Sequence, residues 1–344
     1  MSVAAVNSLV TYVADLSPAE LCQLYYVLGA AAVLAVAAAP ATAQQLLTQY
    51  GARGSSEASA SGSSSALQDR SARNGTEKGF LINLVRWLTS VGKVPHSWFI
   101  HFYVLSLSCS IFWAVQYVRR GTIFAFLAEH QASHTSASMT IEQVLLVWFF
   151  MCLQGARRLY EYLVVLRPSS SRMWVIHWLL GNSFYLCTSI AIWIEGSRRS
   201  PRHLCILPHI NLCIESAWSS KPTLFSTETL SLNLAIGVPM FLFSWLMQYR
   251  CHKHLSGLKK YSLPEDGLFQ YLVCPHYTCE CLLYLSLAIT AAPKGQLYNK
   301  TLLCAVLFVS INLGVTANGT KRWYCDKFGQ EKVHGKWKMI PGVF

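Results

Sequence analysis

The sequence has few charged residues, and few of those are acidic. Only 13% of its 344 residues are Asp, Glu, Lys or Arg, against about 25% in an ordinary soluble domain. So little charge excludes a disordered chain and does not suit a soluble enzyme. Two nucleotide-binding signatures are also missing, since there is neither a G-x-G-x-x-G string after a strand nor a Walker A lysine loop. A Rossmann or P-loop domain is therefore not expected.

Apolar residues, in contrast, make up 53% of the chain. A bilayer core about 30 Å thick is crossed by roughly 20 mainly apolar helical residues. Runs of this length favour helices, which satisfy their own backbone groups in lipid. The predicted fold class is all-α, a polytopic membrane protein with about seven transmembrane helices. The expected spans are Ala19–Ala39, Ser97–Val118, Ile141–Leu166, Met173–Ile194, Thr229–Tyr249, Leu268–Ala292 and Thr301–Ala317.

The distribution of basic residues predicts how the chain crosses the membrane. Net charge is +12, and most Lys and Arg residues lie in the connections after the first, third and fifth spans and in the C-terminal tail. The positive-inside rule places those segments in the cytoplasm, with the N-terminus on the lumenal side. No basic residue precedes the first apolar run, so we expect a retained span rather than a cleaved signal peptide. No nucleic-acid-binding motif accompanies the positive charge, and no nucleic-acid partner is expected.

Three regions are expected along the chain. Residues 1–50 form an N-terminal region with the first transmembrane helix, and residues 51–93 form a flexible cytoplasmic loop rich in Gly and Ser. Residues 94–344 form a six-helix membrane catalytic domain. Cys205 and Cys213 share one loop on the lumenal side and could pair there, whereas the other cysteines mostly lie in apolar runs as small hydrophobes.

The three N-glycosylation sequons are expected to carry little glycan. Asn74 and Asn318 fall on or near the cytoplasmic side, and Asn299 lies close to a membrane span.

The sixth apolar run carries ionisable groups at membrane depth. His276, Tyr277, Glu280 and Tyr284 fall within about a 100° arc of a helix. A buried carboxylate needs a partner, which His276 can provide. The pair either joins two helices or forms part of a ligand site. The spacing of Cys274 and its Cys and His neighbours matches no zinc pattern, so no metal is expected.

Two further groups are candidates for chemistry. Gln154, Arg157, Arg158 and Glu161 form one helical stripe, which is either a salt-bridged face or a polar wall for a cofactor or an anionic headgroup.

In the second span, His101 and Tyr103 enter lipid depth without a balancing charge nearby. Each is either a hydrogen-bonding group inside the bundle or a donor to a substrate carbonyl.

Several strings, in this order, resemble the steroid 5-alpha-reductase family, and most closely its polyprenol (polyprenal) reductase branch. They are WFIHFY (98–103), LQGARRLYE (153–161), QYRCH (248–252), LPEDGLFQYLVCPHYTCE (263–280) and WYCDKFGQEKVHGKWKMIPGVF (323–344). The resemblance covers roughly residues 94–344 and is strongest over the last hundred. It implies a seven-helix enzyme of the endoplasmic reticulum membrane that binds NADPH in a cytoplasm-facing cavity.

The resemblance also assigns site residues. Those expected to contact the cofactor are His252, Lys259, Tyr261, His276, Glu280 and Tyr324. Steroid-type members present Glu and Tyr where this chain has Phe102 and Gly155, which argues against a steroid substrate.

The catalytic candidates are His101, Tyr103 and Gln154, and the substrate-binding candidates are Arg157, Arg158 and Glu161. The expected substrate is a long-chain polyisoprenoid in the bilayer, and no obligate protein partner is inferred.

Two other functional classes remain open on the sequence. An isoprenylcysteine-type membrane methyltransferase also carries an HP-x-Y-like string and a Glu near its C-terminus, but PHYTCE has these residues in a different order. A seven-helix receptor or a transporter fits the topology. However, RRLYE and INLGVTANG stand where receptors usually have DRY and NP-x-x-Y, and repeated broken helices are not apparent.

Overall fold

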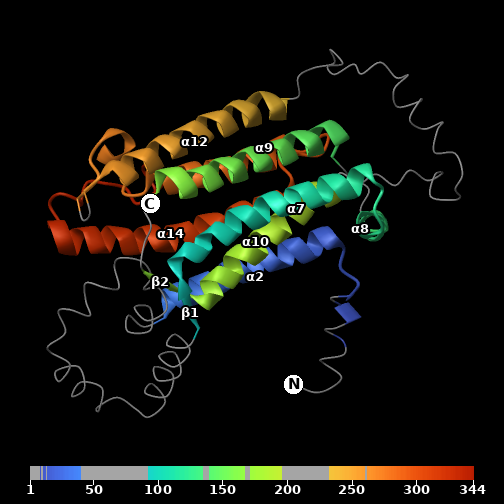
Figure 1. The fold of residues 1–344 in the computed structure, drawn as a ribbon, viewed down its shortest axis with the longest axis horizontal. Helices are drawn as coiled ribbons and strands as arrows, with labels where there is room; N and C mark the ends of the chain where they lie inside the picture. Colours follow the sequence, from blue (N-terminus) through green and yellow to red (C-terminus); the bar gives the residue numbers. More distant parts are fainter. Residues whose placement is uncertain are drawn as a thin grey trace, which may run out of the picture.

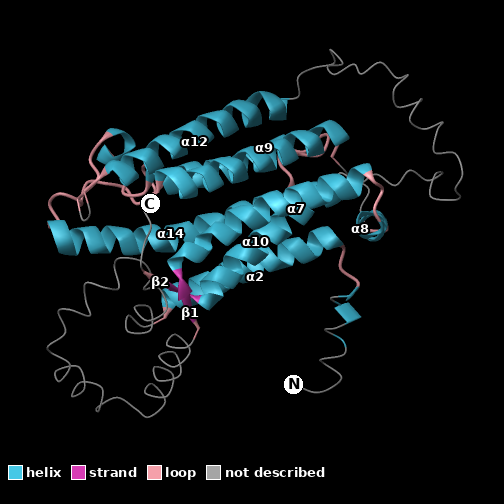
Figure 2. Ribbon diagram, in the orientation of Figure 1, coloured by secondary structure: helices cyan, strands magenta, loops and turns pink. Residues whose placement is uncertain are grey.

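The computed structural model describes residues 8, 11–12, 14–39, 92–134, 139–166, 171–195, 232–259 and 262–344. It is a bundle of long helices that lie side by side along one axis (Figures 1 and 2). The helices are α2 (Pro18–Ala38), α7 (Ile100–Val118), α8 (Thr122–Ala132), α9 (Ile141–Tyr160), α10 (Val175–Ile194), α12 (Leu232–Gly257), α13 (Pro275–Thr290) and α14 (Lys300–Phe328). The shorter elements are β1 (Lys93–Pro95), η2 (His96–Phe99), η3 (Glu161–Val165), β2 (Arg172–Trp174) and η4 (Gly267–Gln270).

Each of the seven apolar runs coincides with a helix, which confirms the all-α class. In the described part of the chain, five helices are long and apolar enough to cross a membrane, namely α2, α7 with η2, α10, α12 and α14. The helices α9 and α13 are not among them; α13 has 16 residues, and α9 carries charged residues near both ends. The apolar helices indicate a multi-pass membrane protein, while the count of seven spans stays a prediction.

Capping residues explain where the helices begin. The Ser17 hydroxyl accepts a hydrogen bond from the Glu20 amide at 3.2 Å, and the Glu20 carboxylate accepts one from the Ser17 amide at 2.9 Å. This capping box, with Pro18 in the first turn, starts α2. Thr140 and Gln143 start α9 in the same way.

Three helix boundaries differ from the sequence prediction. The helix α12 continues to Gly257, so His252 lies on a helix rather than in a loop. The helix α14 continues to Phe328, which puts Tyr324 on a helix rather than in the tail. The helix α13 begins only at Pro275, because proline lacks the N–H of a helix interior and Leu272 before it pairs with Trp337 of the tail.

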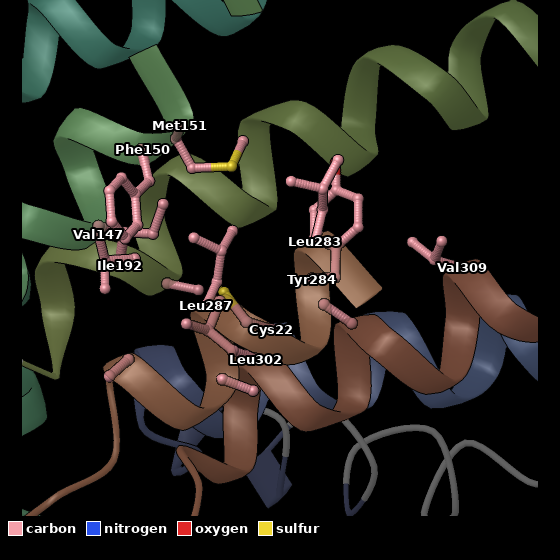
Figure 3. Packing of buried hydrophobic residues seen from close by; sticks show 14 of the residues in the cluster. Cys22, Val147, Phe150, Met151, Ile192, Leu283, Tyr284, Leu287, Leu302 and Val309 are labelled. Carbon is pink, nitrogen blue, oxygen red and sulfur yellow. The ribbon is translucent and has the colours of Figure 1, made fainter. Parts of the chain in front are cut away.

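Aromatic packing forms the centre of the bundle. The Phe184 ring of α10 lies 5.9 Å from Tyr26, 5.3 Å from Tyr284 and 5.6 Å from Phe308, which belong to α2, α13 and α14. Figure 3 shows the neighbouring side chains of this apolar cluster, among them Phe150 of α9. Since lipid is as apolar as these side chains, close packing rather than exclusion of water stabilises the contact. The first helix is therefore packed into the body of the bundle.

The connections gather at two opposite ends (Figure 1). At one end, β1 and β2 pair antiparallel, with Val94 opposite Met173, and the C-terminal tail lies toward the same end. At the other end lies α8. The carboxyl ends of α2, α9 and α12 lie toward the same end as the tail (Figure 1).

The end that carries α8 holds a partly buried carboxylate. The Glu195 carboxylate accepts hydrogen bonds from the Asn299 side-chain amide and the Thr301 hydroxyl. Asn299 is fully buried, and its side-chain oxygen caps α14 by accepting from the Leu302 amide at 2.9 Å. Its sequon is therefore closed to modification in the folded protein. Cys205, Cys213 and Asn74 lie outside the described residues.

Candidate active site

Buried polar side chains from four helices meet near the end of the bundle that carries β1 and β2. We call this group the polar cluster. Its members are Tyr103 of α7, Gln154, Arg157, Arg158 and Glu161 of α9 and η3, Gln248 and His252 of α12, and Glu280 of α13. Polar groups at this depth must pair with one another, because lipid offers no hydrogen bonds.

Glu161 lies at the centre of the cluster and has no exposed surface. Its Oε1 accepts from Arg157 at 2.6 Å, and its Oε2 accepts from Arg158. The Nδ1 of His252 lies 2.7 Å from the same Oε2. Glu161 also begins a π-helical turn, an irregularity that is frequent at functional sites. The carboxylate of Glu161, which lies four residues after Arg157 and three after Arg158, thus neutralises part of the charge of both guanidinium groups.

Arg158 connects this ion pair to Tyr103. Its NH2 donates to the Tyr103 hydroxyl oxygen at 2.7 Å, and its guanidinium carbon lies 5.0 Å from the centre of the Tyr103 ring. The Tyr103 side chain is only 5% exposed. Because the phenol oxygen accepts from the guanidinium, its own O–H remains to donate to another group.

Two glutamines hold the carboxylate of Glu280. Its Oε2 accepts from the side-chain amides of Gln154, at 3.3 Å, and Gln248. The Gln248 side-chain oxygen accepts in turn from Gln154, at 3.1 Å, and from Arg157. The Gln248 amide also donates to the backbone carbonyl of His276 at 3.2 Å. Gln248 therefore joins α9, α12 and α13.

The structure brings most of the expected site residues together. Tyr103, Gln154, Arg157, Arg158, Glu161, His252 and Glu280 are all in the cluster. The ring of His276 lies 5.6 Å from that of His252, so His276 borders the cluster.

His101 lies outside the cluster. It is exposed on the outer face of α7, where its Nδ1 accepts from the Trp178 indole at 3.1 Å. Consecutive helical residues turn by about 100°, so residues 101 and 103 cannot both face the interior.

The remaining cofactor candidates are also apart from the cluster. Lys259 is exposed beyond the end of α12, and Tyr261 is not among the described residues. Tyr324 packs on the small apolar cluster formed by Val273, Cys274, Ala317, Val333 and Met339.

Gln248 is the residue that sequence reasoning missed. It stands one residue before the end of the expected span Thr229–Tyr249 and was not among the candidate site residues. Continuing the period of α12 by one turn would have placed Gln248 and His252 on one face.

The C-terminal tail covers the beginning of α13. The carbonyl of Trp337 accepts from the Val273 amide at 2.8 Å, and that of Lys338 accepts from the Cys274 amide at 3.0 Å. The Thr278 hydroxyl donates to the Met339 carbonyl at 2.5 Å. The tail thereby satisfies the backbone donors of the segment that leads into α13 and a hydroxyl in its first turn.

A cavity of about 290 Å³ lies between the tail and η4. Its mainly apolar walls are Leu268, Tyr271, Leu272, Gly335, Trp337 and Pro341. Lys336 and Lys338 flank the lining residue Trp337 in the sequence. Burial lowers the pKa of Lys336, and burial together with the neighbouring charges of Lys321 and Arg322 lowers the pKa of Lys338. The Nζ of Lys336 donates to the Pro264 carbonyl at 3.2 Å, and that of Lys338 lies 3.9 Å from the centre of the Phe344 ring, so both cations are near the cavity but not in its walls.

The arrangement of acidic, histidine and cysteine side chains bears on metal binding. In the part of the chain that the structure describes, no three or more of these side chains gather as ligands for one metal ion.

Comparison with known proteins shows which proteins this chain resembles. The profile of the 3-oxo-5-alpha-steroid 4-dehydrogenases matches residues 204–344, which include α12, α13, α14 and the tail. A polyprenal reductase of Ailuropoda melanoleuca is 24% identical over 274 residues, covering 74% of this chain and 79% of the relative. Polyprenal reductases of Drosophila melanogaster, covering 77% and 79%, and Arabidopsis thaliana, covering 68% and 77%, are each 26% identical.

The matched profile includes α12 and α13, the helices that contribute Gln248, His252 and Glu280 to the polar cluster. Over α12, α13, α14 and the tail the chain is similar to the 3-oxo-5-alpha-steroid 4-dehydrogenases, and over about three quarters of its length it is similar to polyprenal reductases, which are oxidoreductases.

Proposed function

We propose that the protein is an NADPH-dependent reductase that saturates the α-isoprene double bond of polyprenal, on the way to dolichol for protein glycosylation. The observation that carries the proposal is the Tyr103 hydroxyl, held by Arg158 and buried near the carboxylate of Glu280. The relatives' names agree with an oxidoreductase that acts on a CH–CH group.

The chemistry selects the aldehyde as substrate. Hydride does not add to an isolated alkene, because the carbanion formed is not stabilised. In an α,β-unsaturated aldehyde the negative charge moves to oxygen, where a hydrogen-bond donor stabilises it. An allylic alcohol has no such electron acceptor. The substrate is therefore polyprenal rather than polyprenol, and another enzyme would reduce the resulting dolichal.

Tyr103 is the donor that we assign to the carbonyl oxygen. Arg158 fixes the phenol oxygen at 2.7 Å, so the O–H points elsewhere. The Arg158 charge also stabilises negative charge that develops on the phenol during donation. Arg157 and Glu161 hold Arg158 in place, which makes them positioning groups. His101 lies on the outer face of α7, whereas Tyr103 faces inward, so His101 cannot donate to the same carbonyl oxygen.

The cofactor site is assigned to the C-terminal half. When bound, NADPH supplies the hydride. The cavity beside Tyr271 and Trp337 offers aromatic walls to an adenine ring, and Lys336 and Lys338 offer charge to its phosphates. Further into the bundle, Gln154 and Gln248 hold one oxygen of Glu280, and its other oxygen is an acceptor for a carboxamide.

This assignment of substrate and cofactor to different helices suggests a role for each region of the chain. The region 94–344 is the catalytic part, in which α7, α9 and α10 face the substrate and α12 to α14 face the cofactor. We place the protein in the endoplasmic reticulum membrane, with a lumenal N-terminus and with the cofactor site and C-terminus in the cytoplasm. The isoprenoid tail leaves between helices into the bilayer, because a chain of that length exceeds any closed pocket.

The test gives purified protein and NADPH either polyprenal or polyprenol of the same chain length. We expect saturated product from the aldehyde only. Faster turnover of the alcohol would refute the proposal. Two variants sharpen the result. Tyr103→Phe removes the donor and should lower kcat by roughly 100-fold, whereas His101→Phe should leave kcat within about twofold.

A further inference from the structure

Conjugate reduction of an aldehyde needs two donors rather than one. Hydride bonds to the β-carbon, the electron pair of the double bond moves toward the carbonyl, and the oxygen becomes an enolate. One donor stabilises that oxygen. A second must deliver a proton to the carbon next to the carbonyl, because the carbonyl re-forms only when that carbon is protonated. The following inference rests on the proposed function and concerns this second donor.

Tyr185 of α10 packs on the apolar cluster to which Tyr103 belongs. Phe102 also belongs to this cluster, and the rings of Tyr185 and Phe102 are stacked with centroids 6.4 Å apart. Tyr185 is only partly buried. Its phenol is within electrostatic reach of Arg158 as well as of Tyr103. It therefore borders the space beside the first donor from a different helix.

A second phenol supports Tyr185 from the cofactor side. Tyr284, one turn after Glu280 on α13, is 3% exposed, and the phenols of Tyr284 and Tyr185 act on each other electrostatically. The Glu280 carboxylate acts electrostatically on both phenols. Since Tyr284 is enclosed and Tyr185 is not, Tyr185 is the one of the two that a substrate can touch.

We propose that Tyr185 is a catalytic residue that protonates the carbon next to the carbonyl. Its O–H bond breaks, the proton bonds to that carbon, and the enolate electron pair forms the new C–H bond as the carbonyl is restored. The phenolate left on Tyr185 takes a proton from water, directly or through Tyr284. The balance is one hydride from the cofactor and one proton from solvent for each aldehyde reduced.

The experiment compares the wild type with Tyr185→Phe in polyprenal reduction in D₂O. We expect kcat to fall roughly 100-fold, while NADPH still protects the protein against thermal unfolding with unchanged affinity. The deuterium beside the carbonyl should enter on one face in the wild type and on both faces in the variant. The matched control is Tyr26→Phe, which removes another buried phenol, bonded at 2.9 Å to Thr188, and should keep kcat and stereochemistry.

If Tyr185→Phe does not fold, a second measurement tests the role of Tyr185. Introducing 3-fluorotyrosine at position 185 keeps the hydroxyl but makes it more acidic, so the alkaline limb of the pH–kcat profile should move to lower pH. A residue with a purely structural role would not move it. Turnover and one-face labelling equal to wild type in Tyr185→Phe, or an unmoved pH profile, would overturn the inference while the proposed function stands. A wild type that does not reduce polyprenal would overturn both.

Discussion

At the scale of single residues, Glu161 determines whether the polar cluster holds together. It is fully buried and accepts from both Arg157 and Arg158. A buried ion pair contributes little net stability, but removing one partner leaves the other charge without compensation. The cluster is therefore far more sensitive to loss of its central carboxylate than to loss of any peripheral hydrogen bond.

Glu161→Gln should lower the free energy of unfolding by about 3–5 kcal/mol. It should also lower kcat, because Arg158 loses the group that orients it toward Tyr103. Thermal unfolding in detergent measures the first effect and NADPH oxidation the second. Glu142→Gln, on an exposed position of the same helix, is the matched control and should change neither. Equal melting temperatures for the two variants would contradict a central role for Glu161.

The helical period predicted the stripe from Gln154 to Glu161, because one period fixes the spacing of all its members. It could not predict the partners of that stripe. Gln248 and Tyr103 come from other helices, and their contacts depend on how those helices rotate about their axes. His101 shows the same limit, since composition alone does not say which of two residues on a helix faces inward.

At the scale of elements, the tail and α13 act as one unit. Carbonyls of the tail accept from Val273, Cys274 and Thr278 at the start of α13. Hydropathy predicted the seven helical runs, since an apolar run of that length has no other favourable structure in lipid. It did not predict this cap, the β1–β2 pair or the π turn at Glu161, each of which depends on contacts between distant segments.

Charge in the tail should make cofactor affinity depend on pH. Burial and nearby Lys321 and Arg322 lower the pKa of Lys338 from the usual 10.5. The free protein therefore loses this proton at a pH where a phosphate-bound lysine would keep it, and binding must take the proton up. NADPH affinity should fall as pH rises from neutrality toward 10.5, when measured by thermal-shift titration.

The control for this effect is Lys338→Arg, which stays charged and should flatten the pH dependence of NADPH affinity. Titration with NADH provides a second comparison, since it lacks the 2′-phosphate. An identical pH profile for wild type and Lys338→Arg would show that Lys338 does not meet the phosphate.

At the scale of the whole molecule, the two ends of the bundle should face different compartments. The tail and β1–β2 lie at one end, and the segment before α14 lies at the other (Figure 1). Trypsin added to sealed microsomes should cut at exposed Lys332 without detergent and at exposed Lys294 only after detergent is added. Mass spectrometry of the fragments reads the result. The opposite order would put the tail in the lumen and remove the proposed route for the cofactor.

The helices α9 and α13, together with η3, carry five of the eight members of the polar cluster. In the part of the chain that the structure describes, neither α9 nor α13 is among the five helices that are apolar and long enough to span a membrane alone. While the chain is being synthesised, α9 emerges after α7 but long before α12 and α13, so of their partners in the cluster its arginines then meet Tyr103, Gln154 and Glu161 but neither Gln248 nor His252. Entry of α9 into lipid is costly until the later helices arrive with Gln248 and His252. We therefore expect α9 to remain at the insertion machinery until the second half of the protein has been made.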